Sequence, residues 1–303
     1  MNQSETLAPE TLAPEILTLK HGQLRFTARA MGSGPVVLCL HGFPDTLCTF
    51  DGLLPALAAS GFRGVAVAMR GYEPQSQPAN EDYHAVRMAE DVAAWIDQLG
   101  DGPVHLVGHD WGATIAFAAA ALVPDQIASL VALAVPHPLR FAEVYAASPE
   151  QQRRSHYIQT FQAGEADARL LADDCAELVA LWRAWSPGWA IPTDDLAEVR
   201  AAIARPGVVH AILEWYRQAF DFTSHESLAT QALLAGPFRA PTLGLVGEDD
   251  GCIAADVFEA AMQPRDFPGG LAVHRVAGAG HFLHREQHGR VIPLMLDWLA
   301  RHR

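Results

Sequence analysis

Residues 108–113, with the sequence GHDWGA, constrain the fold of this 303-residue chain more than any other feature. The buried-strand pattern VHLVG leads into this segment, and a run of small apolar residues typical of a buried helix follows it as far as Pro124. A G-x-D-x-G sequence at such a junction predicts a sharp strand-to-helix turn, because its glycines permit strained backbone angles and close helix packing. The turn would present the side chain of Asp110. The alternative is an aspartate that only caps the helix.

Strand-like and helix-like segments alternate on both sides of this turn. The runs ILTLK, QLRFTARA, VVLCL, GVAVAM and IASLVALAV are typical of strands, and TLGLVG and LAVHRVA repeat the pattern near the end of the chain. Helical patterns lie at 82–99, 255–262 and 286–300. The order strand, helix, strand predicts right-handed crossovers in a parallel sheet. We therefore expect an α/β fold with a mostly parallel central sheet flanked by helices.

The sequence between these two blocks has a different character. Residues 139–239 are rich in Ala, Leu, Trp, Arg and Glu and contain few strand signals, which predicts an inserted helical lid. The segment WSPGWAIPTD interrupts the lid, because its prolines and glycine prevent a continuous helix. We expect a core formed by 1–138 and 240–303, with the lid, or cap, at 139–239. Residues 1–15, which contain the tandem repeat TLAPE, are expected to form a loose arm.

The composition favours an enzyme that acts on a small molecule. A net charge of −14 and a pI near 5.4 oppose binding to nucleic acid or to an anionic membrane. The N-terminus has no apolar signal segment and no apolar run approaches the roughly 20 residues of a spanning helix, so we expect a soluble, cytoplasmic protein. No C-x-x-C pair occurs, so we expect reduced thiols and no zinc, other metal or cofactor. The four cysteines are Cys39, Cys48, Cys175 and Cys252. The oligomeric state stays open, with a homodimer among the alternatives.

Two later segments supply partners for Asp110. In turns of this type the chain order is nucleophile, acid, histidine. In the segment LVGEDD, acidic residues directly follow a late strand. We expect Asp250 to be the acid, with its neighbour Asp249 as the alternative. The segment GAGHF supplies His281 after the last strand, and His284 is a local rival. Three roles filled in the right order favour catalysis over an isolated capping aspartate.

Two backbone donors are expected beside Asp110. In folds with this turn, one N–H of the oxyanion hole comes from the residue after the nucleophile and another from a loop after an earlier strand. These positions correspond to Trp111 and, in the segment HGFP, to Phe43. The H-G turn is also compatible with a plain strand end.

The motifs HGFP, AMRGY, GHDWGA, AVPHP, GEDD and GAGHF occur in an order that resembles the α/β-hydrolase fold over nearly the whole chain. Within that fold the chain resembles the epoxide hydrolases and the related haloalkane dehalogenases, which carry aspartate at this turn. An ionised carboxylate attacks saturated carbon without a base, whereas its attack on an acyl carbon would give a strained anhydride. The resemblance implies an alkyl ester on Asp110. Water activated by His281 would hydrolyse that ester while Asp250 orients the imidazole.

The presence of two tyrosines in the lid distinguishes an epoxide hydrolase from a haloalkane dehalogenase. Ring opening creates an alkoxide that needs a proton, whereas a halide departs as a stable anion. The resemblance implies that two lid tyrosines grip the epoxide oxygen, and SHYIQTFQ and EWYRQAF place Tyr157 and Tyr216 at the matching positions. Otherwise each would be an ordinary lid aromatic. We therefore expect an epoxide hydrolase that converts hydrophobic epoxides and water to vicinal diols.

A haloalkane dehalogenase with the same triad is the first alternative. In those relatives an asparagine after H-G or a lid tryptophan holds the halide, and here Phe43 replaces the asparagine. The lid nevertheless offers four tryptophans: Trp182, Trp185, Trp189 and Trp215. Fluoroacetate dehalogenases resemble the chain less, because they carry arginines near the turn. A non-catalytic, ligand-binding member of the fold is a further alternative, against which the intact triad argues.

Overall fold

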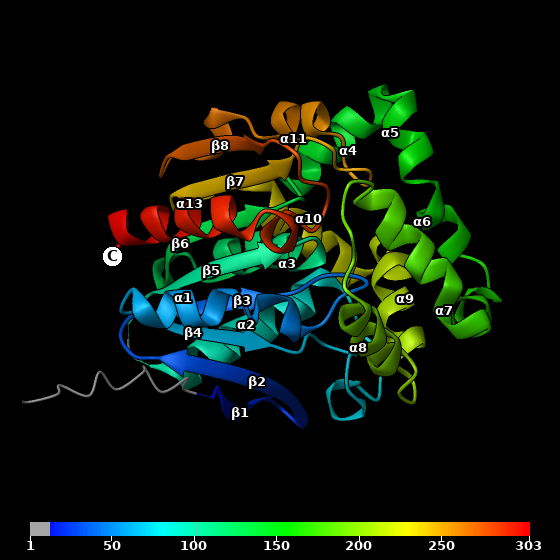
Figure 1. The fold of residues 1–303 in the computed structure, drawn as a ribbon, viewed down its shortest axis with the longest axis horizontal. Helices are drawn as coiled ribbons and strands as arrows, with labels where there is room; N and C mark the ends of the chain where they lie inside the picture. The colour runs from blue at the N-terminus through cyan, green and yellow to red at the C-terminus, as the bar shows by residue number, and fades with distance from the viewer. Residues whose placement is uncertain (1–12, 101) are drawn as a thin grey trace, which may run out of the picture.

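A central sheet organises the protein (Figure 1). The computed structural model describes residues 13–100 and 102–303, and within them the sheet has eight strands in the order β1-β2-β4-β3-β5-β6-β7-β8. The pairs β1–β2 and β2–β4 are antiparallel, and the other pairs are parallel. The strands are β1 (Glu15–His21), β2 (Leu24–Gly32), β3 (Val36–Leu40), β4 (Arg63–Val67), β5 (Val104–His109), β6 (Ile127–Leu133), β7 (Thr242–Gly247) and β8 (Leu271–Val276). The expected α/β class with a mostly parallel sheet is confirmed.

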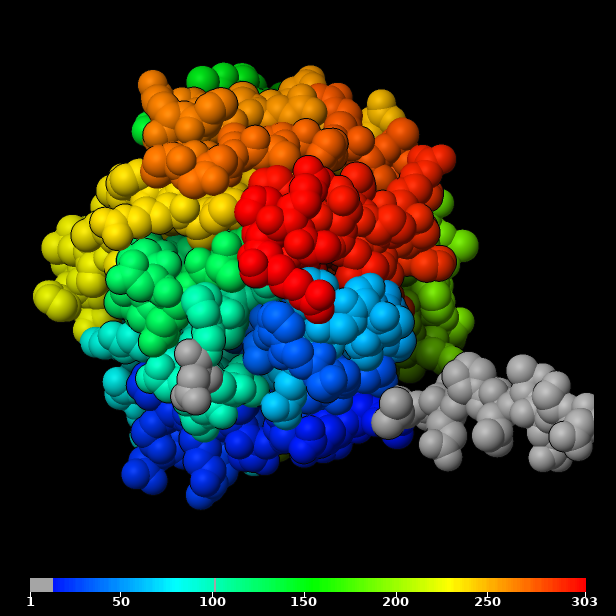
Figure 2. All heavy atoms as spheres, turned by 90° about the vertical axis from the view of Figure 1, so that its left-hand side faces the viewer, coloured from blue at the N-terminus to red at the C-terminus, as the bar shows by residue number. Residues whose placement is uncertain are grey.

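Helices bury both faces of the sheet, which is why its central strands are mostly apolar. Side chains alternate between the faces, so Leu38 and Leu40 of β3 join one apolar core while Val37 and Cys39 join the other. The first core also contains side chains of α2 (Ala85–Leu99), α3 (Trp111–Leu122), α10 (His225–Ala235) and α11 (Ala255–Ala261). The second contains side chains of α1 (Leu53–Ala59), α12 (Leu283–Glu286) and α13 (His288–Arg301). Figure 2 shows α13, in red, beside the blue segment that includes α1.

A group of helices between β6 and β7 lies over the carboxyl ends of the parallel strands (Figure 1). It begins with α4 (Pro138–Ala147). The lid helices, as the term is used from here on, are α5 (Pro149–Arg154), α6 (His156–Phe161), α7 (Ala166–Trp185), α8 (Thr193–Ile203) and α9 (Val208–Ala219). The predicted interruption is confirmed as the loop between α7 and α8. The helix α4 packs against α11, and α10 packs against α2 and α3. The division at 139–239 stays a prediction, and both of its ends are in contact with the core.

Some element boundaries differ from the sequence expectation. Residues 1–12 of the expected arm, with most of the TLAPE repeat, lie outside the described residues. Its last residue, Glu15, is already in β1, where it pairs with Ala30. The expected helix 286–300 is divided at Gln287, whose backbone angles are not helical. Four short 3-10 helices complete the described elements: η1 (Leu47–Phe50), η2 (Pro74–Ser76), η3 (Pro124–Gln126) and η4 (Pro264–Asp266).

In the described part of the chain, no helix combines the length and the apolar character that a membrane crossing requires.

Candidate active site

The turn at Asp110 is strained and depends on its glycines. Asp110 has φ 53° and ψ −123°, between the last residue of β5 and the first residue of α3. A Cβ atom at Gly108 would overlap the backbone of Gly112, and one at Gly112 would overlap the carbonyl of Leu40. Only glycine therefore lets β5, α3 and the end of β3 approach so closely. The predicted strand-to-helix turn is confirmed.

The structure brings Asp110, His281 and Asp250 together. The Nε2 atom of His281 lies 3.4 Å from Oδ2 of Asp110, and its Nδ1 atom lies 3.0 Å from Oδ2 of Asp250. The other oxygen of Asp250 accepts hydrogen bonds from the N–H groups of Cys252 at 2.7 Å and Ile253 at 3.0 Å. All three side chains of the triad are buried. The Asp250 carboxylate is thus fixed by the backbone and can in turn orient the imidazole.

The two rival residues have other surroundings. Asp249 is exposed, so Asp250 is the carboxylate that faces His281. The His284 ring is buried, and its Nε2 atom lies 2.7 Å from Oγ1 of Thr49. The structure therefore brings Asp250 and His281, and not these two neighbours, to Asp110.

The flanking carboxylates control the charge of His281. Burial opposes the charged imidazolium, but Asp250 and Asp110 outweigh it and raise the pKa of His281 to about 10. The imidazole is therefore protonated while Asp110 is a free carboxylate. Any reaction that neutralises Asp110 removes one of the two stabilising charges and favours the neutral base.

One of the two expected backbone donors already contacts the carboxylate. The N–H of Phe43 donates to Oδ1 of Asp110 at 2.8 Å. No corresponding bond from the Trp111 N–H to this carboxylate is present within the described residues. The ring of Trp111 packs instead beside Tyr216, with centroids 5.1 Å apart. The oxygen Oδ1 is therefore held in place, whereas Oδ2 faces His281.

Tyr157 on α6 and Tyr216 on α9 meet close to Asp110. Their ring centroids are 5.9 Å apart, and the ring of Tyr216 also packs on that of Phe43 at 5.2 Å. Burial raises the pKa of both hydroxyls well above the usual value, and the negative charge of Asp110 acts in the same direction. The hydroxyl of Tyr216 has no hydrogen-bond partner among the described residues. Both tyrosines are therefore protonated donors close to the Asp110 carboxylate.

The lid tryptophans differ in what their indole N–H groups can do. Trp182 donates to the carbonyl of Pro44 at 2.9 Å, and Trp215 donates to the carbonyl of Arg70 at 3.2 Å. These two N–H groups are therefore not free to hold a halide. The ring of Trp185 lies 5.0 Å from that of His281 and contributes to the wall of the site.

A buried ion pair anchors the lid to the core next to the site. Arg70 donates from Nε and Nη2 to the carboxylate of Asp91 on α2, both at 2.7 Å. Both side chains are buried, and the Arg70 carbonyl accepts the bond from Trp215 on α9. The position of α9, and with it that of Tyr216, thus depends on this pair.

Some residues near the site were not expected from the sequence. One ligand atom each from Asp110, Cys252 and His281 lies within 4.8 Å of the others, and the Cys252 Sγ is 3.6 Å from the Tyr157 hydroxyl. The described cysteines are free thiols, as expected. The only sequence signal for Cys252 was its position two residues after Asp250.

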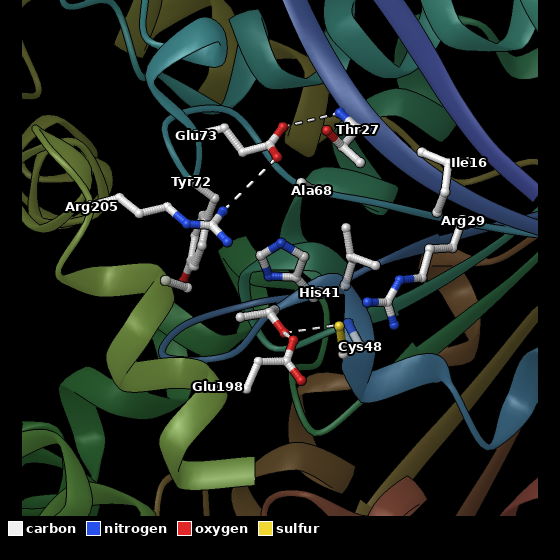
Figure 3. Close-up of a pocket in the computed structure, with 13 residues that line it drawn as sticks. Ile16, Thr27, Arg29, His41, Cys48, Ala68, Tyr72, Glu73, Glu198 and Arg205 are labelled. Carbon is white, nitrogen blue, oxygen red and sulfur yellow. Dashed lines mark hydrogen bonds and ion pairs between the residues drawn. The ribbon is translucent and has the colours of Figure 1, made fainter. Parts of the chain in front are cut away.

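A separate cavity of ≈ 200 Å³ lies between β2 and the lid helix α8 (Figure 3). Thr27 and Arg29 line it from β2, and Glu198 lines it from α8. Glu198 accepts a hydrogen bond from the Thr46 hydroxyl at 2.8 Å. None of the expected catalytic side chains lines this cavity, so it is distinct from the candidate active site.

Comparison with known sequences agrees with this architecture. The sequence model of the family described as alpha/beta hydrolase fold matches residues 35–287. The chain belongs to the α/β-hydrolase fold family. The expectation of a hydrolase of this family is thereby confirmed.

Individual relatives place the chain more narrowly. It is 30% identical to Epoxide hydrolase A of Mycobacterium tuberculosis, over 92% of this chain and 94% of the relative. It is 27% identical to an AB hydrolase superfamily protein of Bacillus subtilis, over 91% and 94% of the two chains. The solved structure of an epoxide hydrolase from an endophytic Streptomyces superposes with a TM-score of 0.78 at 26% identity, covering 95% of this chain and 96% of that one. The expected resemblance to the epoxide hydrolases of this fold is confirmed.

Proposed function

We propose that the protein is an epoxide hydrolase that converts hydrophobic epoxides to vicinal diols. The observation that carries this proposal is the carboxylate of Asp110 at the strained turn, facing His281 on one side and two protonated tyrosines on the other. A carboxylate attacks saturated carbon without help from a base, and the tyrosines supply the proton that an opening epoxide needs.

In the first half of the reaction, Oδ2 of Asp110 attacks one carbon of the epoxide. Oδ1 is held by the Phe43 N–H, which leaves Oδ2 for the new bond. As the C–O bond of the ring breaks, Tyr157 or Tyr216 donates its proton to the departing oxygen. The products of this step are an alkyl ester on Asp110 and a tyrosinate.

In the second half, His281 removes a proton from water while the resulting hydroxide adds to the ester carbonyl carbon of Asp110. Loss of the Asp110 charge lowers the pKa of His281, so the imidazolium gives up its proton, which neutralises the tyrosinate, and the neutral base becomes available. The Phe43 N–H stabilises the oxyanion that develops at Oδ1. Collapse of the intermediate breaks its bond to the alkyl oxygen, which takes up the proton of the added hydroxyl as the diol leaves. Asp110 ends as a carboxylate, His281 ends protonated by the water, and the tyrosines are neutral as at the start, so the sum is epoxide plus water.

The side chains around the triad favour an apolar substrate. The rings of Phe43, Phe161 and Trp185 lie within the same aromatic cluster as the two tyrosines. These rings bind hydrocarbon surface well, while the tyrosine hydroxyls and the triad provide polar contacts. Aryl and alkyl epoxides therefore fit the site better than charged ones.

Diol formation from styrene oxide, measured in parallel with bromide release from a bromoalkane, tests the proposal. We expect diol from the wild type and none from Asp110→Ala. Bromide without diol would replace the proposal by a haloalkane dehalogenase. If neither product forms across a series of aryl and alkyl epoxides, the epoxide assignment fails and a ligand-binding role remains.

A further inference from the structure

A second cluster of polar side chains lies beside the active site, where three segments of the chain meet. Asp45 follows HGFP after β3, His109 is the last residue of β5, and His284 is in α12. One ligand atom of each residue lies within 4.8 Å of those of the other two. The exposed fractions are 2% for Asp45, 0% for His109 and 5% for His284. Three residues far apart in sequence thus converge in the buried interior.

Hydrogen bonds determine which nitrogen of His109 carries its proton. Its Nε2 atom lies 3.0 Å from the backbone carbonyl of His281. Because a carbonyl only accepts, Nε2 is the protonated nitrogen and Nδ1 carries a lone pair. Burial lowers the pKa of His109 to about 3, which keeps the ring neutral.

The ring of His284 also has one hydrogen-bond partner. Its Nε2 atom lies 2.7 Å from Oγ1 of Thr49, and its Nδ1 atom has no hydrogen-bond partner among the described residues. When Nε2 donates to the hydroxyl, Nδ1 carries the lone pair that a metal ion needs. Burial lowers the pKa of His284 well below its usual value, so this ring is neutral as well.

Each of the three residues has one buried atom that can act as a metal ligand. These atoms are Oδ2 of Asp45, Nδ1 of His109 and Nδ1 of His284, and none has a hydrogen-bond partner among the described residues. Burial raises the pKa of Asp45 to about 7, and the charge of Arg285 offsets this only in part. One carboxylate oxygen and two imidazole nitrogens that converge without partners are suitable ligands for a cation.

We propose that Asp45, His109 and His284 form a binding site for one divalent transition-metal ion of the zinc class. Two neutral imidazoles and a carboxylate are a ligand set that Zn²⁺ and Co²⁺ accept, with water completing the coordination. The bonds from His109 to the His281 carbonyl and between His284 and Thr49 orient the two rings, as outer partners of metal ligands do.

The ion would link three chain segments that lie next to the candidate catalytic groups. Asp45 is two residues after Phe43, His109 precedes Asp110, and His284 is three residues after His281. Binding is therefore expected to raise the melting temperature of the chain. The inference does not depend on the epoxide reaction, because it uses none of the triad side chains.

The active-site cluster of Asp110, Cys252 and His281 is the competing location for a metal. It differs in one respect that can be measured, because Cys252 would contribute a thiolate. A thiolate bound to Co²⁺ produces a ligand-to-metal charge-transfer band that nitrogen and oxygen ligands do not produce. Cobalt spectra therefore distinguish the two sites.

The experiment uses the full chain, stripped with a chelator and then titrated with Zn²⁺ under equilibrium dialysis and with Co²⁺ under absorption spectroscopy. We expect one equivalent of metal and a tetrahedral Co²⁺ spectrum without the thiolate band, both unchanged in Cys252→Ser. His284→Gln and Asp45→Asn should weaken binding more than about tenfold. His105→Gln is the matched control, since His105 is also buried and bonded, to Ser129 at 2.8 Å, but lies outside the cluster.

Circular dichroism and melting curves without metal establish that each variant is folded. The two ligand variants, His284→Gln and Asp45→Asn, test the proposal independently of each other. Absence of stoichiometric binding by the wild type would overturn the proposal. So would a thiolate band that disappears in Cys252→Ser, or equal affinity in the wild type, His284→Gln and Asp45→Asn.

Discussion

The Nε2 atom of His281 lies 3.4 Å from Oδ2 of Asp110 while its Nδ1 atom lies 3.0 Å from Asp250, so one imidazole is held between two carboxylates. The acid on the Nδ1 side is fixed by two backbone N–H groups. The acid on the Nε2 side is the proposed nucleophile, whose charge disappears when it is alkylated. In the account proposed here, the same histidine therefore pairs with the nucleophile before attack and serves as a base after it.

Replacing the lid tyrosines should slow epoxide opening. Tyr157→Phe and Tyr216→Phe each remove one proton donor, and the double variant removes both, so we expect a loss in kcat of roughly 10²–10⁴-fold in the double variant. Each single variant should lose less, because the other hydroxyl remains. Steady-state rates with styrene oxide measure the effect, and unchanged melting curves exclude unfolding. A double variant with the wild-type rate would contradict the assignment.

The protonation of His281 should make stability depend on pH. Its pKa is about 10 in the folded chain and about 6.5 when unfolded. The raised value means that the charged imidazole stabilises the fold fully below pH ~6.5, and that this stabilisation is lost as the pH rises toward 10. Urea denaturation at several pH values should show that the free energy of unfolding falls less with rising pH in His281→Gln than in the wild type. The same dependence of this free energy on pH in both proteins would disprove the contribution of His281.

The glycine inside the turn should tolerate no side chain. In Gly112→Ala the new Cβ would overlap the Leu40 and His41 carbonyls, so we expect a destabilisation of about 3 kcal/mol or more. Gly52→Ala is the control, because a Cβ there meets nothing within 4 Å; it should change the free energy of unfolding by less than ~0.5 kcal/mol. Chemical denaturation measures both. Similar values for the two variants would argue against the close packing at the turn.

The buried ion pair beside the lid should matter more than an exposed one. Asp91→Asn leaves Arg70 buried without its counter-charge, and we expect a cost of about 3–5 kcal/mol. Asp51→Asn removes a similar two-bond pair with Arg29 at the surface, where about 0–1 kcal/mol is expected. Urea denaturation compares them directly. A cost for Asp91→Asn no larger than that for Asp51→Asn would show that the Arg70 pair does not anchor the lid.

The sequence was most informative where local chemistry determines the backbone. The GHDWGA turn was predictable because only glycine allows its angles and contacts, and the strands were predictable because sheet burial on both faces requires apolar runs. The choice between Asp249 and Asp250 was less secure. The two are neighbours, and only the tertiary structure leaves one exposed and turns the other toward His281.

The cluster of Asp45, His109 and His284 could not be predicted in the same way. Its members come from three chain segments that meet only because parallel strands end at one edge of the sheet. Each of the three residues belongs to a motif or turn that accounts for it without a metal. The spacing of cysteines, from which no zinc site was expected, carries no information about a site made of histidine and aspartate. The packing of α4 and α10 on the core likewise depends on tertiary contacts that a helical pattern does not reveal.

The covalent intermediate is the central claim, and the intact mass of His281→Gln after exposure to styrene oxide tests it most directly. Without the base, the ester on Asp110 should form but not hydrolyse. We expect the protein mass to increase by one molecule of styrene oxide, with the added mass mapped to the peptide that contains Asp110 and absent in the double variant Asp110→Ala, His281→Gln. Diol production by His281→Gln without any adduct, or an adduct that persists when Asp110 is removed, would contradict attack by this carboxylate.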